Sequence, residues 1–257
     1  DLGPAFVKLG QILSTRPDIL PDAYIAALAT LQEHAPVVPF EVIKATAETE
    51  LCGTLLEHFA RFDPEPVASA SLAQVHRATL TDGTAVAVKV QRPGIDGLIT
   101  RDLDALDFGL GILRAIAPRR LRRTNLSAFF AEFRRYTLSE LDFSAEAQTM
   151  ERFRQNFAGH AAVTIPRTYP QLTTSRFLTM DWIDGMRLGE AVVALAEDDK
   201  DRLVSGLVDV LLKMFVSDGL FHADLHPGNI VFHADGRFTL LDFGMVGQLT
   251  GPQRDRF

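Results

Sequence analysis

The stretch His222-Ala223-Asp224-Leu225-His226-Pro227-Gly228-Asn229, followed after a short apolar segment by Asp242-Phe243-Gly244, decides the fold. A carboxylate can orient a hydroxyl that accepts a phosphoryl group, and amide and carboxylate oxygens are ligands that Mg²⁺ accepts. Kinases place these groups in an H-x-D-x-x-x-x-N loop and a D-F-G turn. The stretch therefore predicts a phosphoryl-transfer site in which Asp224 is catalytic and Asn229 and Asp242 bind Mg²⁺.

The segment between the two motifs predicts a β-hairpin. Two mostly apolar runs, Ile230 to His233 and Phe238 to Leu241, flank a turn dipeptide, Asp235-Gly236. A two-residue turn at this dipeptide would place Asn229 directly opposite Asp242 and bring two metal ligands together. The alternative is an ordinary acidic hairpin without a metal, which the combined match of both motifs disfavours.

A zinc site at His222 and His226 is a second alternative. Histidines four residues apart face the same way only on a helix, and Pro227-Gly228 favours a loop instead. Structural hydrogen bonding is therefore the better expectation for both rings.

A strand pair lies upstream, with arms at Val75 to Leu80 and Ala85 to Val90 around an Asp82-Gly83 turn. Lys89 and Ala87 share one face of the second arm. A lysine there suits phosphate contact, and the small Ala87 leaves room for a purine ring. Such a lysine needs a carboxylate partner from a helix, and Glu146 on a predicted helix from the 140s to Phe157 is the expected one.

The segment before the first arm reads Ala68-Ser69-Ala70-Ser71, where an ordinary protein kinase has a glycine-rich loop. Alanine does not reach the positive φ conformations that glycine adopts readily. We therefore expect a stiffer loop whose backbone amides are less free to surround a triphosphate. Without Lys89 nearby, a plain turn of small residues would be an equal interpretation.

The remaining periodicity predicts mostly helices. Proline-containing breaks divide the first helices, an inserted helical element follows the strand pair, and an apolar strand precedes a long helix with a buried stripe. The expected helices span residues 4–34 with breaks, 40–60, 98–116, 126–138 and 201–215, and the expected strand spans residues 177–183.

Composition bounds the function. The 257 residues are 47% hydrophobic and 23% charged, which is typical of a globular protein that buries a core. The net charge of −7 argues against nucleic acid as a partner. The single cysteine, Cys52, cannot form an internal disulfide and favours a reducing, cytoplasmic compartment. Charges interrupt the best apolar stretch, Leu203 to Phe221, so no membrane span is expected.

Four motifs in order carry a family resemblance. Lys8-Leu9-Gly10-Gln11 fits a K-x-G-Q motif, Ala68 to Ser71 an alanine-rich loop with Ser69 in place of one alanine, and Glu140-Leu141-Asp142 an E-x-D motif. With the catalytic and D-F-G motifs, the whole chain resembles the UbiB family of atypical kinase-like proteins, also called aarF-domain kinases.

The resemblance implies that the K-x-G-Q helix folds over the nucleotide site. Lys8, with Gln11 on the same helix, would approach the carboxylates of Glu140 and Asp142, and Glu146 would pair with Lys89. It also implies a Mg²⁺-ATP-dependent ATPase or kinase that supports ubiquinone biosynthesis. The partners would be an isoprenoid lipid or quinone precursor and other quinone-biosynthesis proteins, with a membrane reached through parts outside this chain.

We expect a protein-kinase-like α+β fold with an N-terminal helical extension. The extension would span residues 1–60, a small lobe residues 61–183 with a helical insert at about 95–138, and the start of a truncated C-terminal lobe residues 184–257. The hinge, Met180-Asp181-Trp182-Ile183, would offer backbone groups to adenine. Two other functions are open: a small-molecule kinase of the aminoglycoside or choline type, which lacks K-x-G-Q and E-x-D, and a nucleotide-binding pseudokinase that serves as a lipid scaffold.

Overall fold

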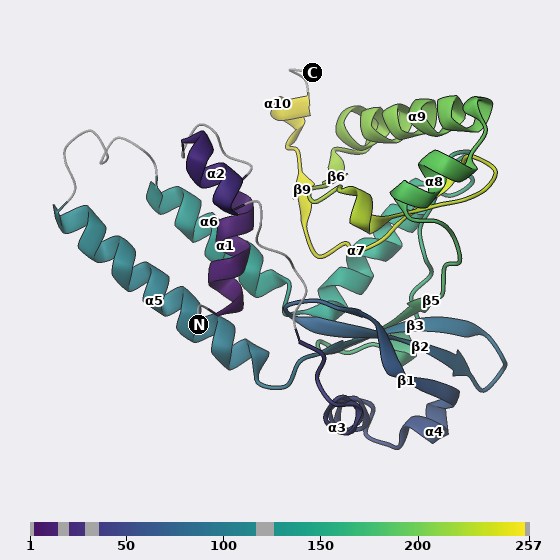
Figure 1. Cartoon of the computed structure of the whole chain (residues 1–257), viewed down its shortest axis with the longest axis horizontal. Helices are drawn as coiled ribbons and strands as arrows, with labels where there is room; N and C mark the ends of the chain where they lie inside the picture. Colours follow the sequence, from purple (N-terminus) through teal and green to yellow (C-terminus); the bar gives the residue numbers. More distant parts are fainter. Residues whose placement is uncertain (1–2, 15–20, 29–35, 117–125, 255–257) are drawn as a thin grey trace. The chain divides into compact units, whose positions relative to one another are not determined.

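The structure is a computed structural model that describes residues 3–14, 21–28, 36–116 and 126–254. The chain divides into two compact units (Figure 1). One unit comprises residues 1–55, 63–76 and 89–141, and the other comprises residues 56–62, 77–88 and 142–257. Among the described residues, no helix combines the length and the apolar character that crossing a membrane requires.

A helical layer forms much of the first unit (Figure 1). It contains α1 (Pro4–Ser14), α2 (Asp22–Leu28), α5 (Ile95–Ile116) and α6 (Leu126–Ser139), so the predicted helical insert is confirmed. The buried side chains of α1, α5 and α6 form one hydrophobic core that contains Ala5, Leu9, Ile95, Ile99, Leu103 and Phe133.

The start of α1 depends on a residue distant in sequence. The carboxylate of Asp102, on α5, accepts a hydrogen bond from the Ala5 amide at 3.1 Å and so caps the helix. Pro4 occupies the first helical position, where its missing N–H costs nothing. A Cβ on Gly3 would lie 2.1 Å from an oxygen of Asp102, so glycine makes this close approach possible.

The first sheet extends beyond the predicted strand pair, because β1 adds a strand at its edge. Strands β1 (Phe59–Ser69), β2 (Ala73–Leu80), β3 (Ala85–Gln91) and β5 (Phe177–Asp181) form one sheet in that order. The helical stretch expected over residues 40–60 is confirmed for α3 (Phe40–Leu51) and the short α4 (Leu55–His58), but the chain enters β1 at Phe59. The sequence analysis missed β1 because it contains Pro64 and Pro66, which only an edge strand tolerates.

Both Asp-Gly turns belong to three-residue loops. In the first, the Leu80 amide donates to Thr84 and the Gly83 amide donates to Leu80, with Gly83 at φ 90°. In the second, the His233 amide donates to Arg237 and Gly236 has φ 77°. A positive φ at the third loop residue is the usual requirement of such a loop, and glycine meets it.

The second unit carries the remaining elements. Two further sheets form there, with strand orders β4-β8-β7 and β6-β9. Its elements are α7 (Phe143–Asn156), β4 (Val163–Thr164), η2 (Pro170–Leu172), β5, α8 (Leu188–Ala194), α9 (Glu197–Leu212), η3 (Lys213–Asp218), β6 (Leu220–His222), η4 (Pro227–Asn229), β7 (Ile230–Phe232), β8 (Phe238–Leu240), β9 (Val246–Gln248) and α10 (Gly251–Arg254).

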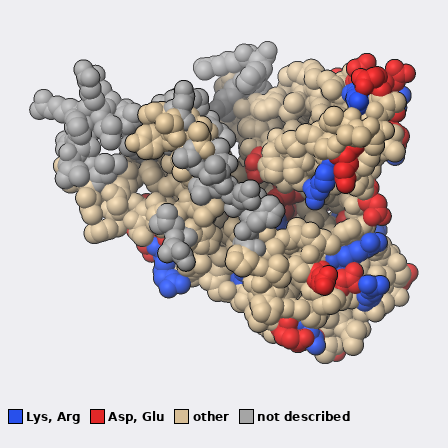
Figure 2. Space-filling model, in the orientation of Figure 1, with Lys and Arg blue, Asp and Glu red and all other residues tan. Residues whose placement is uncertain are grey.

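The N-terminal end of α9 supports the β7–β8 hairpin. Acidic residues occupy the first turn of α9, where the helix dipole favours them, and Figure 2 shows acidic side chains gathered at this end of the helix. Arg202 donates to the carbonyl of Asp235 at 3.0 Å and pairs with Asp199 at 2.8 Å. A Cβ on Gly236 would lie 2.9 Å from the Asp199 carbonyl, so the turn and the helix are in close contact.

Candidate active site

Two short antiparallel strands hold the catalytic loop to the segment after the D-F-G turn. In the β6–β9 pair, Leu220 lies opposite Gln248 and His222 lies opposite Val246. The pairing continues one residue further, because the Ala223 amide donates to the Met245 carbonyl at 3.0 Å. The start of the catalytic loop and the end of the D-F-G turn are thus fixed to each other by backbone bonds.

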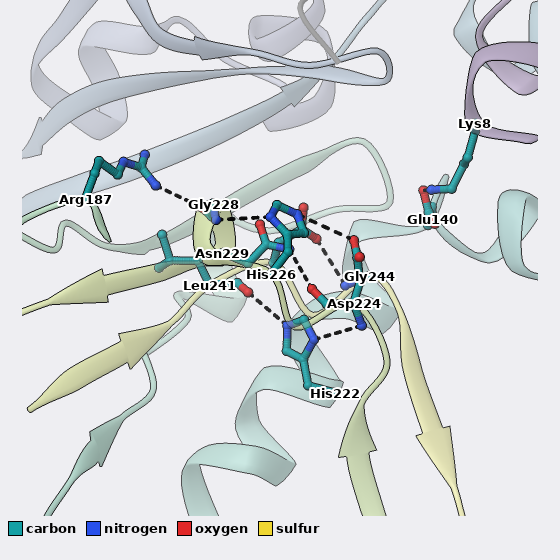
Figure 3. Close-up of polar contacts among 11 residues, drawn as sticks. Lys8, Glu140, Arg187, His222, Asp224, His226, Gly228, Asn229, Leu241 and Gly244 are labelled. Carbon is teal, nitrogen blue, oxygen red and sulfur yellow. Dashed lines mark hydrogen bonds and ion pairs between the residues drawn. The ribbon is translucent and has the colours of Figure 1, made fainter. Parts of the chain in front are cut away.

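His222 is a structural residue. Its Nδ1 accepts from the Asp224 amide at 3.2 Å, so the neutral ring carries its proton on Nε2, which donates to the Leu241 carbonyl at 3.1 Å. Only 4% of the residue is exposed, and its ring lies 5.2 Å from that of Phe243. The expectation of structural hydrogen bonding is confirmed, and this ring connects the catalytic loop with the strand that carries Asp242 (Figure 3).

The predicted register of the second hairpin is wrong by one residue. Ile230 lies opposite Leu240, and the Leu241 amide donates to the Asn229 carbonyl at 2.8 Å, so the partner of Asn229 is Leu241 and not Asp242. The three-residue turn causes the shift. Asp242 instead follows the pair directly, which still delivers both predicted ligands to the same open end of the hairpin.

Asp242 leaves the strand through an unusual backbone conformation. Its φ is 54°, in the left-handed region that few residues other than glycine adopt and in which aspartate is enriched. Its carboxylate accepts from the Gly244 amide at 3.3 Å. The next residue, Phe243, is 1% exposed and packs against Phe153 of α7 at 4.9 Å between ring centroids. This buried anchor holds the turn and so supports the conformation of Asp242.

Asp224 and Asn229 are joined through the loop backbone (Figure 3). The Asn229 Nδ2 donates to the Asp224 carbonyl at 3.1 Å, and the His226 amide donates to the same oxygen at 3.1 Å. With its Nδ2 held in this way, Asn229 presents Oδ1 on the other side of the amide group. The carboxylate of Asp224 is about half exposed, so an acceptor hydroxyl or a water molecule can reach it.

His226 makes a hydrogen bond within its own loop. Its Nδ1 accepts from the Gly228 amide at 3.0 Å, and its Nε2 lies 3.9 Å from the Asp224 carboxylate. In the described part of the chain, no group of three or more histidine, cysteine, aspartate or glutamate side chains is placed to hold a metal ion. Asn229 and Asp242 offer oxygen donors at the open end of the hairpin, and oxygen donors are the kind that Mg²⁺ prefers; their role as metal ligands stays a prediction.

The structure adds a residue that the sequence analysis missed. Arg187, which precedes α8, donates from Nη1 to the Gly228 carbonyl at 2.8 Å, and its own amide is held by Glu190 at 2.9 Å (Figure 3). Arg187 therefore fixes the short η4 turn that ends at Asn229. No motif in the sequence distinguishes this arginine from a surface residue.

The expected nucleotide-contacting residues lie on the predicted elements. Ala87 is buried and Lys89 half-buried on β3, and Glu146 is 5% exposed on α7. Ala68 and Ser69 end β1, and Ala70 and Ser71 lie in the turn that leads into β2. The pairing of Lys89 with Glu146 stays a prediction.

The predicted hinge follows the last strand of the first sheet. Met180 and Asp181 end β5; the Asp181 amide donates to the Arg167 carbonyl at 2.9 Å, and the Trp182 amide donates to the Ala85 carbonyl at 3.2 Å. These two amides are thus used within the protein. Adenine recognition by this segment, including Ile183, therefore depends on its other backbone groups and stays a prediction.

The K-x-G-Q and E-x-D motifs meet as expected, but through one carboxylate. Lys8 forms a salt bridge with Glu140 in which both side chains are mostly buried (Figure 3), whereas Gln11 lies on the next turn of α1. The carboxylate of Asp142 caps α7, accepting from the Ser144 amide at 3.0 Å and the Ala145 amide at 3.4 Å. The prediction for Lys8 is thus confirmed for Glu140, and Asp142 has a capping role.

The geometry defines the class of protein as kinase-like. A family described as the ABC1 atypical kinase-like domain matches residues 30–257. The chain therefore belongs to this family, whose members include the aarF-domain kinases, and the family resemblance seen in the motifs is confirmed.

Two relatives show how much of a longer protein this chain covers. The chloroplast protein ACTIVITY OF BC1 COMPLEX KINASE 3 of Arabidopsis thaliana is 40% identical, across 100% of this chain and 36% of its own length. A Synechocystis protein, sll0095, is 40% identical across 99% of this chain and 46% of its own length. The chain thus spans less than half the length of these relatives.

A solved structure shares the fold. The structure of Rv3197 from Mycobacterium tuberculosis, determined as a complex with erythromycin, is 31% identical and has a TM-score of 0.69. The similarity covers 97% of this chain and 62% of the other. The expected kinase-like α+β fold is confirmed.

Proposed function

We propose that this chain binds Mg²⁺-ATP and transfers or hydrolyses its terminal phosphoryl group, as the nucleotide-binding part of an atypical kinase or ATPase. The observation that carries the proposal is the arrangement of Asp224, Asn229 and Asp242. Backbone bonds join the catalytic loop to the D-F-G turn, and the Asn229 amide group is fixed by the Asp224 carbonyl.

Each side chain of the proposed site would have a separate role. Asn229 and Asp242 would hold Mg²⁺, which neutralises charge on the phosphates when it is bound. The half-exposed carboxylate of Asp224 would accept a hydrogen bond from the attacking hydroxyl or water and take its proton. The new bond to the γ-phosphorus would form as the bond between this phosphorus and the β–γ bridging oxygen breaks, and ADP would leave. Lys89 would contact the phosphates.

The alanine-rich loop bears on nucleotide choice. Ala68 and Ala70 are exposed, so their methyl groups contribute little to the core. They restrict the backbone where glycine would leave it free, which supports a loop of fixed shape rather than one that adapts to each nucleotide.

We further propose that the whole protein acts in isoprenoid quinone metabolism, on ubiquinone precursors or on proteins that handle them. This part of the proposal rests on the resemblance of the four motifs to the UbiB family, which implies a role in ubiquinone biosynthesis. The match to the ABC1 atypical kinase-like domain disfavours the alternative of a small-molecule kinase of the aminoglycoside or choline type. A nucleotide-binding pseudokinase that carries lipid remains the competing function, and the intact set of Asp224, Asn229 and Asp242 counts against it.

Turnover of ATP by the full-length protein tests the proposal. The protein is assayed with Mg²⁺, with and without vesicles that contain a polyprenylated phenol. Asp224→Asn should reduce turnover by at least about 100-fold and leave ATP affinity within about threefold, because the carboxylate acts in the chemical step. Asp198→Asn, on the exposed first turn of α9, is the matched control. ATP binding without any turnover in the wild-type protein would favour the scaffold.

A further inference from the structure

Arg92, which directly follows β3, makes an unusual set of contacts with the alanine-rich loop. Its Nε donates to the Ala70 carbonyl at 2.8 Å and its Nη2 donates to the Ser69 hydroxyl at 2.7 Å. Its backbone amide donates to the Leu72 carbonyl at 2.9 Å. Arg92 therefore contacts Ser69 and Ala70 of the loop and Leu72, which directly follows the loop.

The same guanidinium reaches the segment that precedes α3. Nη2 also donates to the Pro36 carbonyl at 2.8 Å. Arg92 is half-buried, and this burial, which partly removes its charge from water, lowers the pKa of its guanidinium below the ordinary value. Oxygen acceptors from three residues compensate this desolvation, which makes the arrangement specific for the planar fork of arginine.

These contacts fix the direction of one peptide group. The peptide bond between Ala70 and Ser71 is trans, so its carbonyl and its N–H point to opposite sides. The Ala70 carbonyl faces the Arg92 guanidinium, and the Ser71 N–H therefore points away from it. The loop thus directs an amide hydrogen, and not a carbonyl oxygen, to the side opposite Arg92.

We propose that Arg92 is a positioning residue for nucleotide binding: it holds the alanine-rich loop so that the Ser71 amide can meet a phosphate oxygen. This inference rests on the proposed function of the site. Without the guanidinium, the peptide group between Ala70 and Ser71 can rotate. The Ala70 carbonyl would then point to the side opposite Arg92, where it would repel a phosphate oxygen. Ser69, the position at which this chain departs from the alanines of the motif, supplies the second side-chain contact and strengthens the hold.

Two readouts test the proposal on the full chain. Hydrogen exchange over residues 68–73, measured without nucleotide, reports how firmly the loop is held. The dissociation constant for Mg²⁺-ATP reports its effect on binding. Arg92→Ala should accelerate exchange in this peptide about 10-fold and weaken Mg²⁺-ATP binding about 10-fold, since it removes hydrogen bonds to a charged donor.

Three further variants sharpen the result. Arg92→Lys keeps the charge but cannot span the three acceptors, so it should restore only part of both effects. Ser69→Ala removes one contact and should change each readout by about two- to threefold. Arg135→Ala, at an exposed arginine of α6 that pairs with Glu132, is the matched control and should leave both readouts at wild-type values.

The possible outcomes are distinct. Loop exchange unchanged in Arg92→Ala overturns the proposal, and so does faster exchange spread evenly over the whole chain, which marks a general structural support. Faster loop exchange with unchanged Mg²⁺-ATP affinity also overturns it. If the wild-type protein binds no Mg²⁺-ATP, the proposed function fails, and loop-specific acceleration in Arg92→Ala would still show that Arg92 positions the loop.

Discussion

At the scale of single residues, His76 shows how a buried titratable group is satisfied in one protonation state. It is fully buried on β2, and its Nδ1 lies 2.9 Å from the Asp63 carbonyl, which can only accept, so Nδ1 carries the proton. Its Nε2 then accepts from the side-chain amide of Gln74 at 3.3 Å, and Gln74 in turn bonds the backbone of Val38. A second proton on the ring would face the NH₂ group of Gln74.

This arrangement predicts a pH dependence of stability. Burial lowers the pKa of His76 below its ordinary value of 6.5, outweighing the Asp63 carbonyl and charge, which raise it. As the pH falls below about 6.5, the unfolded chain takes up a proton before the folded chain does, so the free energy of unfolding decreases. Each unit by which the folded pKa is lowered corresponds to about 1.4 kcal/mol.

Urea unfolding at pH 7.5 and at pH 5.5 measures the effect. His76→Gln, which keeps a donor for Asp63, should show a smaller loss of stability between the two pH values than the wild-type chain. His58→Gln, at the end of α4, is the control and should behave as wild type. Equal losses in wild type and His76→Gln would contradict the assignment of a neutral His76.

The residues proposed to act in catalysis and metal binding were identified from the sequence alone. Asp224, Asn229 and Asp242 belong to motifs whose spacing reflects a required geometry. Arg92 and Arg187 were not predictable, because each acts through hydrogen bonds to backbone carbonyls. Such bonds depend on where a distant loop lies in space, and they leave no pattern in the residues that receive them.

At the scale of elements, two helices are capped by aspartates, one adjacent in sequence to its helix and the other distant from it. Asp142 caps α7 from the adjacent position in sequence, whereas Asp102 caps α1 from another helix. Both satisfy amides at a helix N-terminus, where the dipole favours a negative charge. The second kind of cap also joins α1 to α5, in addition to the core contacts between them. The salt bridge of Lys8 with Glu140 joins α1 to the residue that directly follows α6.

The two caps predict opposite local effects. Asp102→Ala should lower the local stability of α1 by about 1–2 kcal/mol and leave α7 unchanged, and Asp142→Ala should do the reverse. The rate of hydrogen exchange, measured separately for the backbone amides of α1 and of α7, tests this prediction. Each variant serves as the control for the other. Equal acceleration of both helices in Asp102→Ala would mean that the carboxylate supports the whole chain rather than one helix end.

Elements in which apolar residues recur at a regular spacing were predicted well. The register of the hairpin and the edge strand β1 were not. The insert helices and α7 follow from apolar spacing, as do the short strands around Asp235-Gly236. The hairpin register was wrong because the dipeptide does not reveal whether a third residue joins the turn. Strand β1 was missed because Pro64 and Pro66 normally end regular structure, and the sequence does not show that this strand lies at an edge.

At the scale of the whole molecule, the chain holds the motifs of its family in two compact units, each with its own internal contacts. The pair of Lys8 and Glu140 is formed within the first unit, and the catalytic loop with the D-F-G turn is formed within the second. A cover over the nucleotide site by α1 stays a prediction. In the proposed function, the second unit presents Asp242 as a ligand of Mg²⁺ for nucleotide binding.

Calorimetric titration of the protein with ATP, with Mg²⁺ and with excess chelator, tests this claim most directly. The wild-type chain should bind ATP in a Mg²⁺-dependent manner. Asp242→Asn should weaken this binding at least about 10-fold and leave the circular dichroism spectrum unchanged, because the exposed carboxylate contributes little to packing. Asp235→Asn, at the opposite end of the same hairpin, should bind as wild type. Equal Mg²⁺-ATP affinity of Asp242→Asn and the wild-type chain would contradict the account.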